Sequence, residues 1–372
     1  MPCFTAHPRK RRPPTWRMIM ATVLLGLSVA CDGDSRDTAS STTGVGNDEA
    51  LNRAQVAAAP SFADIDAAAQ AIETLLNAQR TREAELVARK LCEQVPSDSP
   101  QSARVYELAA RAYFARAELA KHELEPADIK ALISDAALAA QRSAQTGAPD
   151  AVRLRFAALL ADRIGNHQEA VTLYDQALAV KPDDLLTLLP AASSAIGRKD
   201  FARAQALIER HRIIAPQEAW SEGIAAELAI AQARFTDAVS CAQAAVALDR
   251  ERVEFRLILA RALRLDQRAS DSARLLSALE TEVRARIPVA QQFALALTAC
   301  GDFSAAANAW NTALRANPND PFVRAETALA FHRAGDDARA AAELTALDAM
   351  RGGPQEHARI APSLIESSSH AP

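Results

Sequence analysis

Apolar and polar residues along most of this chain follow helical spacing. Alanine is abundant, and long stretches contain neither proline nor glycine. Few segments alternate apolar and polar residues with a period of two, which is the pattern of a half-buried β-strand. Alanine has the highest helix propensity, and its small side chain lets neighbouring helices pack closely. The pattern therefore predicts an all-α protein without a β-sheet.

One arrangement of small and large residues recurs with a 34-residue period between positions 151 and 354. Its first copy has the small residues Ala170 and Ala177 on either side of the large residue Tyr174, and Pro182 closes the unit. Six copies in one unbroken register exceed what an alanine-rich composition produces by chance. From one unit to the next, the first small position continues as Ala204, Ala238, Ser272, Ala306 and Ala340.

A turn residue precedes each copy of this arrangement. Gly165 takes this place in the first unit, and it recurs as Gly301 and Gly335, with Lys199, Ala233 and Gln267 in the units between. Glycine adopts the left-handed backbone conformation that commonly ends a helix. Proline, in contrast, suits the first turn of the next helix, where its missing N–H costs little. Each unit is therefore predicted to be two helices joined by a turn.

These units resemble the tetratricopeptide repeat, which has the same period. The resemblance implies a right-handed α-solenoid of antiparallel helix pairs. The first helix of the family's repeat usually carries an aromatic residue, a leucine-glycine pair and a tyrosine. Here alanine and leucine stand in those places, as in Leu154, Ala157 and Ala158. This departure predicts a compact variant of the repeat.

The predicted solenoid spans residues 61–354 and contains about eight repeats. Residues 65–98 match the pattern, and residues 102–150 resemble an enlarged repeat with helices near 102–119 and 127–146. The regular register follows from residue 151 to residue 354. Residues 355–372 are mostly polar, so we expect a C-terminal tail with at most one weak helical turn.

The N-terminus has the features of a bacterial targeting segment. Basic residues between Arg9 and Arg17 precede an apolar run, Met18 to Ala30, that is too short for a good transmembrane helix. This order predicts a signal peptide over residues 1–30. Leu27 to Cys31 resembles the bacterial lipobox, with its leucine one place early. We therefore predict lipidation of Cys31; the alternatives are an ordinary secretory signal or a cytoplasmic tail.

Residues 31–60 are predicted to be the lipidated cysteine and a disordered tether. Serine, threonine, glycine and aspartate dominate residues 32–49, and such a composition cannot bury enough apolar surface to fold. Lipidated cysteine, tether and folded body together are the common plan of bacterial lipoproteins. Asp32 resembles the signal that retains enteric lipoproteins in the inner membrane. The expected location is the periplasmic side of a membrane, with the inner membrane favoured.

Charge and motifs argue against nucleic-acid binding and catalysis. The predicted signal peptide, residues 1–30, carries a net charge of +5, whereas the whole chain carries −4, so the body is acidic. An acidic body without a basic stripe is poorly suited to bind a phosphate backbone. The sequence has no phosphate-binding glycine loop, nucleophile elbow or metal-binding cysteine spacing. We expect no enzyme activity, cofactor or metal, and interpret Cys92, Cys241 and Cys300 as small core residues.

The resemblance also predicts where a partner binds. The first helices of tetratricopeptide repeats line a concave groove that holds extended peptides or helices. The lysine and asparagine clamp that holds a C-terminal carboxylate in chaperone-binding members is missing. Projecting the groove onto this sequence gives the candidate partner-binding residues Tyr106, Tyr113, Arg155, Leu159, Leu189, Glu227, Arg261, Arg264, Gln291, Leu295 and His332.

Two of these candidates, Tyr106 and Tyr113, are separated by two helical turns and so share one face of a helix. The neighbouring apolar face could supply the packing and leave both rings free to line the groove. The alternative is that both rings pack against the long second helix of the enlarged repeat.

The predicted function is that of a membrane-anchored periplasmic tetratricopeptide lipoprotein. It would act as a protein-protein interaction scaffold in the assembly or regulation of a cell-envelope complex for pilus formation or secretion, for cell-wall synthesis or for polysaccharide export. A non-lipidated cytoplasmic or soluble periplasmic adaptor is the second interpretation. A regulatory partner of an enzyme is the third.

Overall fold

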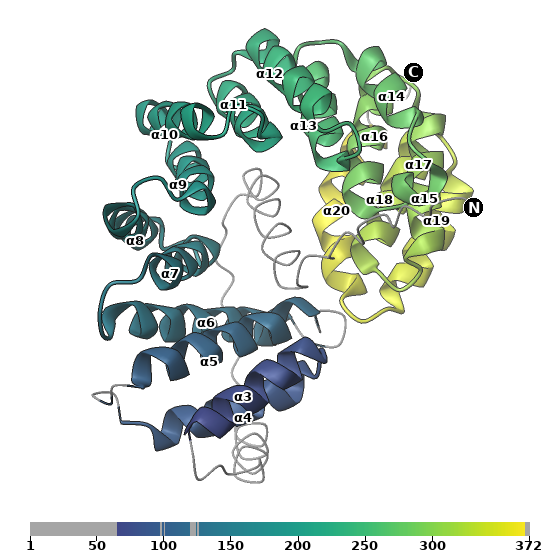
Figure 1. The fold of residues 1–372 in the computed structure, drawn as a ribbon. Coiled ribbons are helices and arrows are strands. Elements are labelled where there is room, and N and C mark those ends of the chain that lie inside the picture. The colour runs from purple at the N-terminus through teal and green to yellow at the C-terminus, as the bar shows by residue number, and fades with distance from the viewer. Residues whose placement is uncertain (1–64, 97–98, 100, 120–123, 125, 369–372) are drawn as a thin grey trace, which may run out of the picture. The chain divides into compact units, whose positions relative to one another are not determined.

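The computed structural model describes residues 65–368 except 97–98, 100, 120–123 and 125. The predicted signal peptide, Cys31 and the whole predicted tether lie outside this range. In the described part every regular element is an α-helix (Figure 1). The helices are α3 (Ile65–Asn77), α4 (Thr81–Gln94), α5 (Ser102–Leu119), α6 (Pro126–Gln145), α7 (Ala151–Arg163), α8 (His167–Val180), α9 (Leu185–Gly197), α10 (Phe201–Ile214), α11 (Ala219–Ala231), α12 (Phe235–Leu248), α13 (Val253–Leu265), α14 (Ala269–Ser277), α15 (Thr281–Arg284), α16 (Ile287–Ala299), α17 (Phe303–Ala316), α18 (Pro321–Arg333), α19 (Asp337–Asp348) and α20 (Gly353–Ser368).

The helices pack as consecutive pairs within two compact units. The N-terminal unit ends at Ile214 and contains the pairs α3–α4, α5–α6, α7–α8 and α9–α10. The C-terminal unit begins at Ala215 and contains α11–α12, α13–α14, α16–α17 and α18–α19, with the short α15 and the final α20. The prediction of an all-α fold built from consecutive helix pairs is confirmed.

The 34-residue register appears directly in the helix boundaries. From α7 onward the first helices begin at positions 151, 185, 219, 253, 287 and 321, and the second helices begin at positions 167, 201, 235, 269, 303 and 337. Both series advance by the same constant interval. The turn position also keeps one backbone conformation whatever residue occupies it. Its φ angle is positive at Gly165 (82°), Lys199 (62°), Ala233 (56°), Gln267 (61°), Gly301 (79°) and Gly335 (75°).

The small position of the repeat lies in the core of both units. Ala170, Ala204 and Ala238 have no exposed surface, and Ala306 and Ala340 are also buried. A larger side chain here would push the paired helices apart. Ser272 takes the same position because its hydroxyl donates a hydrogen bond of 2.8 Å to the carbonyl of Ala260. A buried hydroxyl is tolerated where it finds such a partner.

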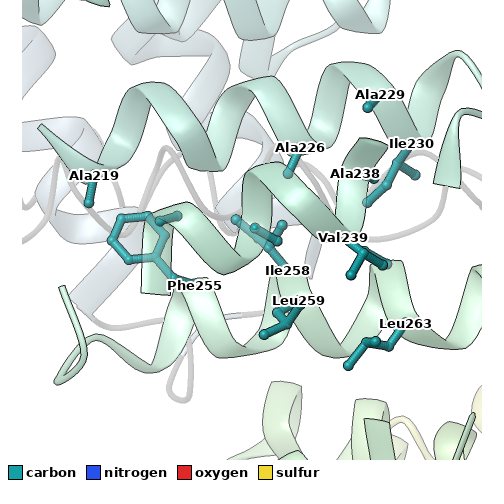
Figure 2. Packing of buried hydrophobic residues seen from close by; sticks show 13 residues of the cluster. Ala219, Ala226, Ala229, Ile230, Ala238, Val239, Phe255, Ile258, Leu259 and Leu263 are labelled. Atoms are coloured by element: carbon teal, nitrogen blue, oxygen red, sulfur yellow. The ribbon is translucent and has the colours of Figure 1, made fainter. Parts of the chain in front are cut away.

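A representative core lies between α11, α12 and α13 in the C-terminal unit (Figure 2). Phe255 is fully buried and packs edge-on against Trp220, with ring centroids 4.9 Å apart. Gly223 faces this ring so closely that an added Cβ atom would lie 3.0 Å from Phe255 Cε1. Glycine at this position therefore allows α11 to approach the aromatic ring.

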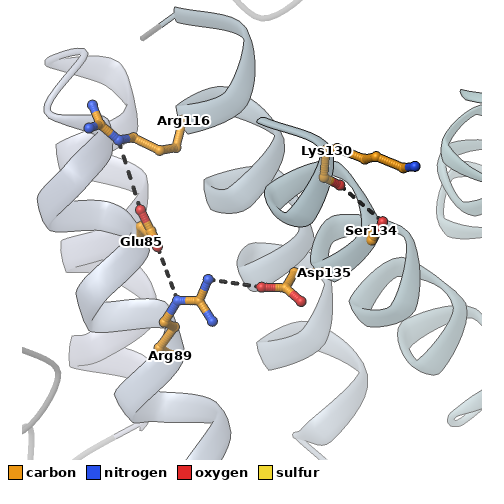
Figure 3. Close-up of polar contacts among 6 residues, drawn as sticks. All are labelled: Glu85, Arg89, Arg116, Lys130, Ser134 and Asp135. Carbon is orange, nitrogen blue, oxygen red and sulfur yellow. Dashed lines mark hydrogen bonds and ion pairs between the residues drawn. The ribbon is translucent and has the colours of Figure 1, made fainter. Parts of the chain in front are cut away.

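The enlarged repeat of the N-terminal unit is joined to the first repeat by a chain of ion pairs. Figure 3 shows Glu85 between two arginines: Arg116 on α5, at 3.9 Å, and Arg89 on its own helix α4, at 3.0 Å. Arg89 also pairs with Asp135 on α6, at 2.8 Å. Two arginines and two carboxylates balance one another, so this network links three helices without leaving a net charge.

The expectation of a polar tail after residue 354 is wrong. Residues 353–368 form the helix α20, which packs on α18 and α19. Ile360 is almost fully buried in a cluster with Ala325, Leu329 and Leu347. Ile360 and Leu364 are one helical turn apart on α20, and the other helices of this cluster supply the surface that buries them.

The interpretation of all three cysteines as core residues is also wrong in one case. Cys92 and Cys241 are half-buried, but Cys300 is exposed at the end of α16. Its position directly before the turn residue Gly301 places it at the helix end rather than between helices.

Candidate functional site

The predicted partner-binding residues on the regular repeats share one face of the first helices. Arg155, Leu189 and Gln291 are the fifth residues of their helices; Leu159, Glu227, Arg261 and Leu295 are the ninth; Arg264 and His332 are the twelfth. Positions separated by three or four residues lie above one another on a helix. The sequence thus placed these side chains on one face, and their burial decides which of them a partner can reach.

Tyr106 and Tyr113 are buried, so the expectation that both rings are free to line a groove is wrong. Their exposed fractions are 7% and 6%. The guanidinium of Arg142, on the long helix α6, lies 5.7 Å from the centre of the Tyr106 ring. Arg89, on α4, lies 4.9 Å from the centre of the Tyr113 ring. Both rings therefore serve the packing of α5 against its neighbours.

The environment of Tyr113 also suppresses ionisation. Burial raises the pKa of Tyr113 far above its usual range, and burial raises the pKa of the Cys92 thiol to about 11. A buried group without a compensating charge favours its neutral form. Neither side chain is ionised at neutral pH, which fits a structural role.

Arg155, Leu159 and Leu189 are buried as well and are not accessible for partner binding in this structure. Arg155 forms an ion pair of 2.7 Å with Asp184, at the start of α9, and Thr187 donates a hydrogen bond of 2.5 Å to the same carboxylate. Burial tends to raise the pKa of Asp184, but the bond from Thr187 and the charge of Arg155 outweigh it and lower that pKa. This arrangement joins α7 to α9.

A second buried carboxylate completes the polar interior of the N-terminal unit. Asp162 accepts a hydrogen bond of 3.0 Å from Ser194, and His167 Nδ1 lies 3.1 Å from the same oxygen. Burial raises the pKa of Asp162, because the bonds from His167 and Ser194 only partly offset the loss of water. On this unit the first-helix face of α7 and α9 is occupied by internal contacts.

The C-terminal unit presents a more accessible face. Glu227 on α11 and Arg261 on α13 form an ion pair of 2.9 Å between neighbouring first helices. Burial raises the pKa of Glu227, and the charge of Arg261 opposes that change. Arg264 lies one turn further along α13 and is half-buried. Three of the predicted residues thus form a charged region on two adjacent helices.

A pocket of about 70 Å³ opens on the next part of this face, between α16, α17 and α18. Its apolar lining combines the buried Trp310 with Leu329 and with two large side chains that solvent reaches, Leu295 (39% exposed) and Phe303 (41% exposed). Two predicted residues, Gln291 and Leu295, line this pocket. The remaining lining residues are Ala294, Thr298, Ala306, Glu326, Ala330 and Arg333.

The two charged residues of the pocket have different surroundings. Glu326 is paired at 2.9 Å with Arg359 of α20. Arg333 is exposed, and no ion pair or hydrogen bond engages its guanidinium among the residues that the structure describes. Among the residues that the structure describes, the pocket lining therefore combines several apolar side chains with one positive charge that has no partner.

His332 does not line this pocket, which corrects its predicted place in the groove. Its Nδ1 lies 2.7 Å from Asp337 and its Nε2 lies 3.0 Å from the carbonyl oxygen of Leu364. The imidazole therefore ties α18 to the start of α19 and to α20. Its neighbour Arg333 lines the pocket instead. Sequence reasoning missed it because Arg333 is the thirteenth residue of α18, one place beyond the predicted position of His332.

Phe303 and Trp310 were also absent from the predicted site because both belong to the second helix α17. Trp310 occupies the large packing position of the repeat, and its ring reaches through the helix pair to the pocket. In the described part of the chain, no three acidic, histidine or cysteine side chains gather closely enough to hold a metal ion.

No family model and no curated protein matches the sequence. Among solved structures, the chain is similar to a tetratricopeptide repeat protein from Parabacteroides merdae ATCC 43184, with a TM-score of 0.56 and 10% identity over 72% of this chain and 98% of that chain. The assembly chaperone of RpL4 (Acl4) aligns with a TM-score of 0.48 and 16% identity over 66% of this chain and 99% of its own. The Cut9 and Hcn1 hetero-tetramer of APC/C aligns with a TM-score of 0.48 and 14% identity over 76% and 51%.

The first of these comparisons, together with the 34-residue register, shows that the chain has the tetratricopeptide-repeat fold. The resemblance predicted from the sequence is confirmed at this level. In the part of the chain that the structure describes, no helix is both long and apolar enough to cross a membrane.

Proposed function

We propose that this protein is a scaffold that binds another protein through the first-helix face of its C-terminal unit. The pocket between α16, α17 and α18 carries this proposal, because it combines solvent-accessible Leu295 and Phe303 with a polar rim. Large apolar side chains surrounded by polar groups are typical of the centre of a protein interface.

The size of the pocket favours a protein partner over a small metabolite. Sites for drug-sized molecules commonly occupy about 300–1,000 Å³, whereas this pocket measures about 70 Å³. Such a volume suits a single side chain of a partner. The charged residues Glu227 and Arg261 on the neighbouring first helices extend the contact surface beyond the pocket.

We further propose that the scaffold is a lipoprotein held at the periplasmic side of a bacterial membrane, with the inner membrane favoured. The basic and apolar segments before Cys31 support this location, and so does the polar composition of residues 32–49. The partner would then belong to a cell-envelope complex. A non-lipidated adaptor would use the same face, so anchoring and binding are tested separately.

Binding is tested by placing a photocrosslinking amino acid at Leu295 in the full chain, expressed in its own cells. The matched control is Gln243, an exposed residue on the second helix α12 of the same unit. A discrete adduct from position 295, absent from position 243 and weakened by Phe303→Ser, is the expected result. Equal labelling at both positions would show that this face has no special affinity and would refute the proposed site.

Anchoring is tested with Cys31→Ser and membrane fractionation. The wild-type chain should sediment with membranes and carry the mass of a lipid on its N-terminal cysteine. The variant should lose both properties or accumulate as an unprocessed precursor. Unchanged fractionation and mass would favour the non-lipidated adaptor.

A further inference from the structure

We propose that the partner presents an apolar side chain with an acidic side chain next to it, so that the first enters the pocket and the second pairs with Arg333. This inference rests on the proposed function and specifies the chemistry of its partner. The juxtaposition that carries it is a pocket lined by large apolar side chains in which, among the described residues, an exposed arginine is the one charge without a partner.

The charges around the pocket point to an anionic partner. Glu326, the acidic group of the lining, is paired with Arg359, which also bonds Glu356 within α20. Arg333 has no such partner among the described residues. A rim charge of this kind contributes chiefly to selectivity and to the rate of association, and it disfavours partners of the same sign.

The neighbouring first helix, α13, also carries charged residues of the predicted site. Arg261 and Arg264 lie on α13, and Arg261 pairs with Glu227 on α11 at 2.9 Å. Arg261 is thus already engaged, and the partner's acidic side chain is assigned to Arg333 at the pocket itself.

Helix geometry limits where the acidic side chain sits. Leu329 and Arg333 both line the pocket and are one helical turn apart on α18, which places their Cβ atoms about 6 Å apart. The partner's carboxylate should therefore lie within about one helical turn of its apolar anchor. In the described part of the chain, Arg333 is the one unpaired cation of the pocket lining, so a side-chain carboxylate within a segment is the source we assign, rather than a chain terminus that needs several donors.

The probe is a fluorescein-labelled peptide of about twelve residues, amidated at its C-terminus, with one leucine-glutamate pair in a neutral background. The full chain is titrated against it in detergent, and fluorescence anisotropy gives the affinity. Two further peptides replace the glutamate by lysine or the leucine by alanine. We expect the leucine-glutamate peptide to bind best, with at least about fivefold weaker binding after either replacement.

Charge reversal provides the decisive comparison. Arg333→Glu should invert the preference, so that the lysine peptide binds better than the glutamate peptide. Arg315→Glu is the matched control, because Arg315 is an exposed arginine on α17 that lies outside the pocket lining. This control should keep the preference of the wild-type chain.

The inference is overturned if Arg333→Glu and Arg315→Glu behave alike, or if the leucine-glutamate peptide does not bind at millimolar concentration. It is also overturned if only a peptide with a free C-terminal carboxylate binds. In cells, Arg333→Glu should reduce the adduct formed from position 295 more than Arg315→Glu does. An undiminished adduct would refute only the inference that the partner is acidic, and it would leave the proposed scaffold function intact.

Discussion

Replacing alanine by glycine should have opposite effects on stability at the turn position of the repeat and inside a helix. Ala233 has a φ angle of 56°, in the left-handed region. A non-glycine residue there costs about 1–2 kcal/mol relative to the right-handed helical region. The two hydrogen bonds of this turn involve only backbone atoms: the N–H of Ala233 donates to Ile230 and that of Arg234 donates to Ala229. Glycine would keep both bonds.

Ala233→Gly should therefore raise the free energy of unfolding. Relief of the strained φ angle is worth about 1–2 kcal/mol, and the greater flexibility of glycine in the unfolded chain offsets about 0.4–1 kcal/mol of it. A net gain of about 0.5–1 kcal/mol would raise Tm by about 2 °C for a unit of this size. The matched control is Ala342→Gly, at an exposed position inside α19, which should lose about 1 kcal/mol.

The assay is thermal unfolding of the full chain, followed by circular dichroism at the helical minimum. The difference between the two variants matters more than either shift alone, because both remove the same methyl group. If Ala233→Gly lowers Tm as much as Ala342→Gly, the left-handed conformation carries no strain that glycine relieves, and the account of this turn must be abandoned.

Three other predictions concern the core and its charges. Gly223→Ala should cost about 1–3 kcal/mol because of its contact with a buried ring, whereas Gly197→Ala, in open space at the end of α9, should be neutral or stabilising; equal Tm shifts would contradict this reading. The buried Tyr106 and Tyr113 should each lose about 3–5 kcal/mol on substitution by alanine; a double variant that melts near the wild type would show that neither ring supports the core. Asp184 has a lowered pKa in the folded state, so its stabilisation is present above the unfolded pKa of about 3.9 and is lost as the pH falls through the folded value. The Tm gap between wild type and Asp184→Asn should therefore be full at neutral pH and shrink below about pH 4. A gap that does not change with pH would show that the ionised carboxylate of Asp184 does not stabilise the folded state.

Some side chains depart from the repeat pattern without changing its backbone. Lys199, Ala233 and Gln267 adopt the left-handed conformation that glycine adopts at Gly165. Local propensity alone does not favour that conformation for these residues. The packing of each helix pair against its neighbours requires the turn, and the stability of the whole unit compensates for the strain.

The sequence by itself determined the helix pairs, their 34-residue register and the face on which the predicted site residues lie. These follow from small and large residues at fixed spacing, which is a local property of the chain. The first and second helices of the regular repeats begin where that register requires them. The same reasoning placed Leu159 and Leu295 at equivalent positions of two different repeats.

Only the tertiary structure decided which residues on that face are accessible. Leu159 is 5% exposed and Leu295 is 39% exposed, although both are the ninth residue of a first helix. Exposure depends on the side chains that neighbouring helices bring to the position, and those helices are distant in sequence. The repeat pattern likewise does not show the burial of Tyr106, the docking of α20 or the unpaired charge of Arg333. Each of these depends on packing between helices rather than on the spacing of residues along one helix.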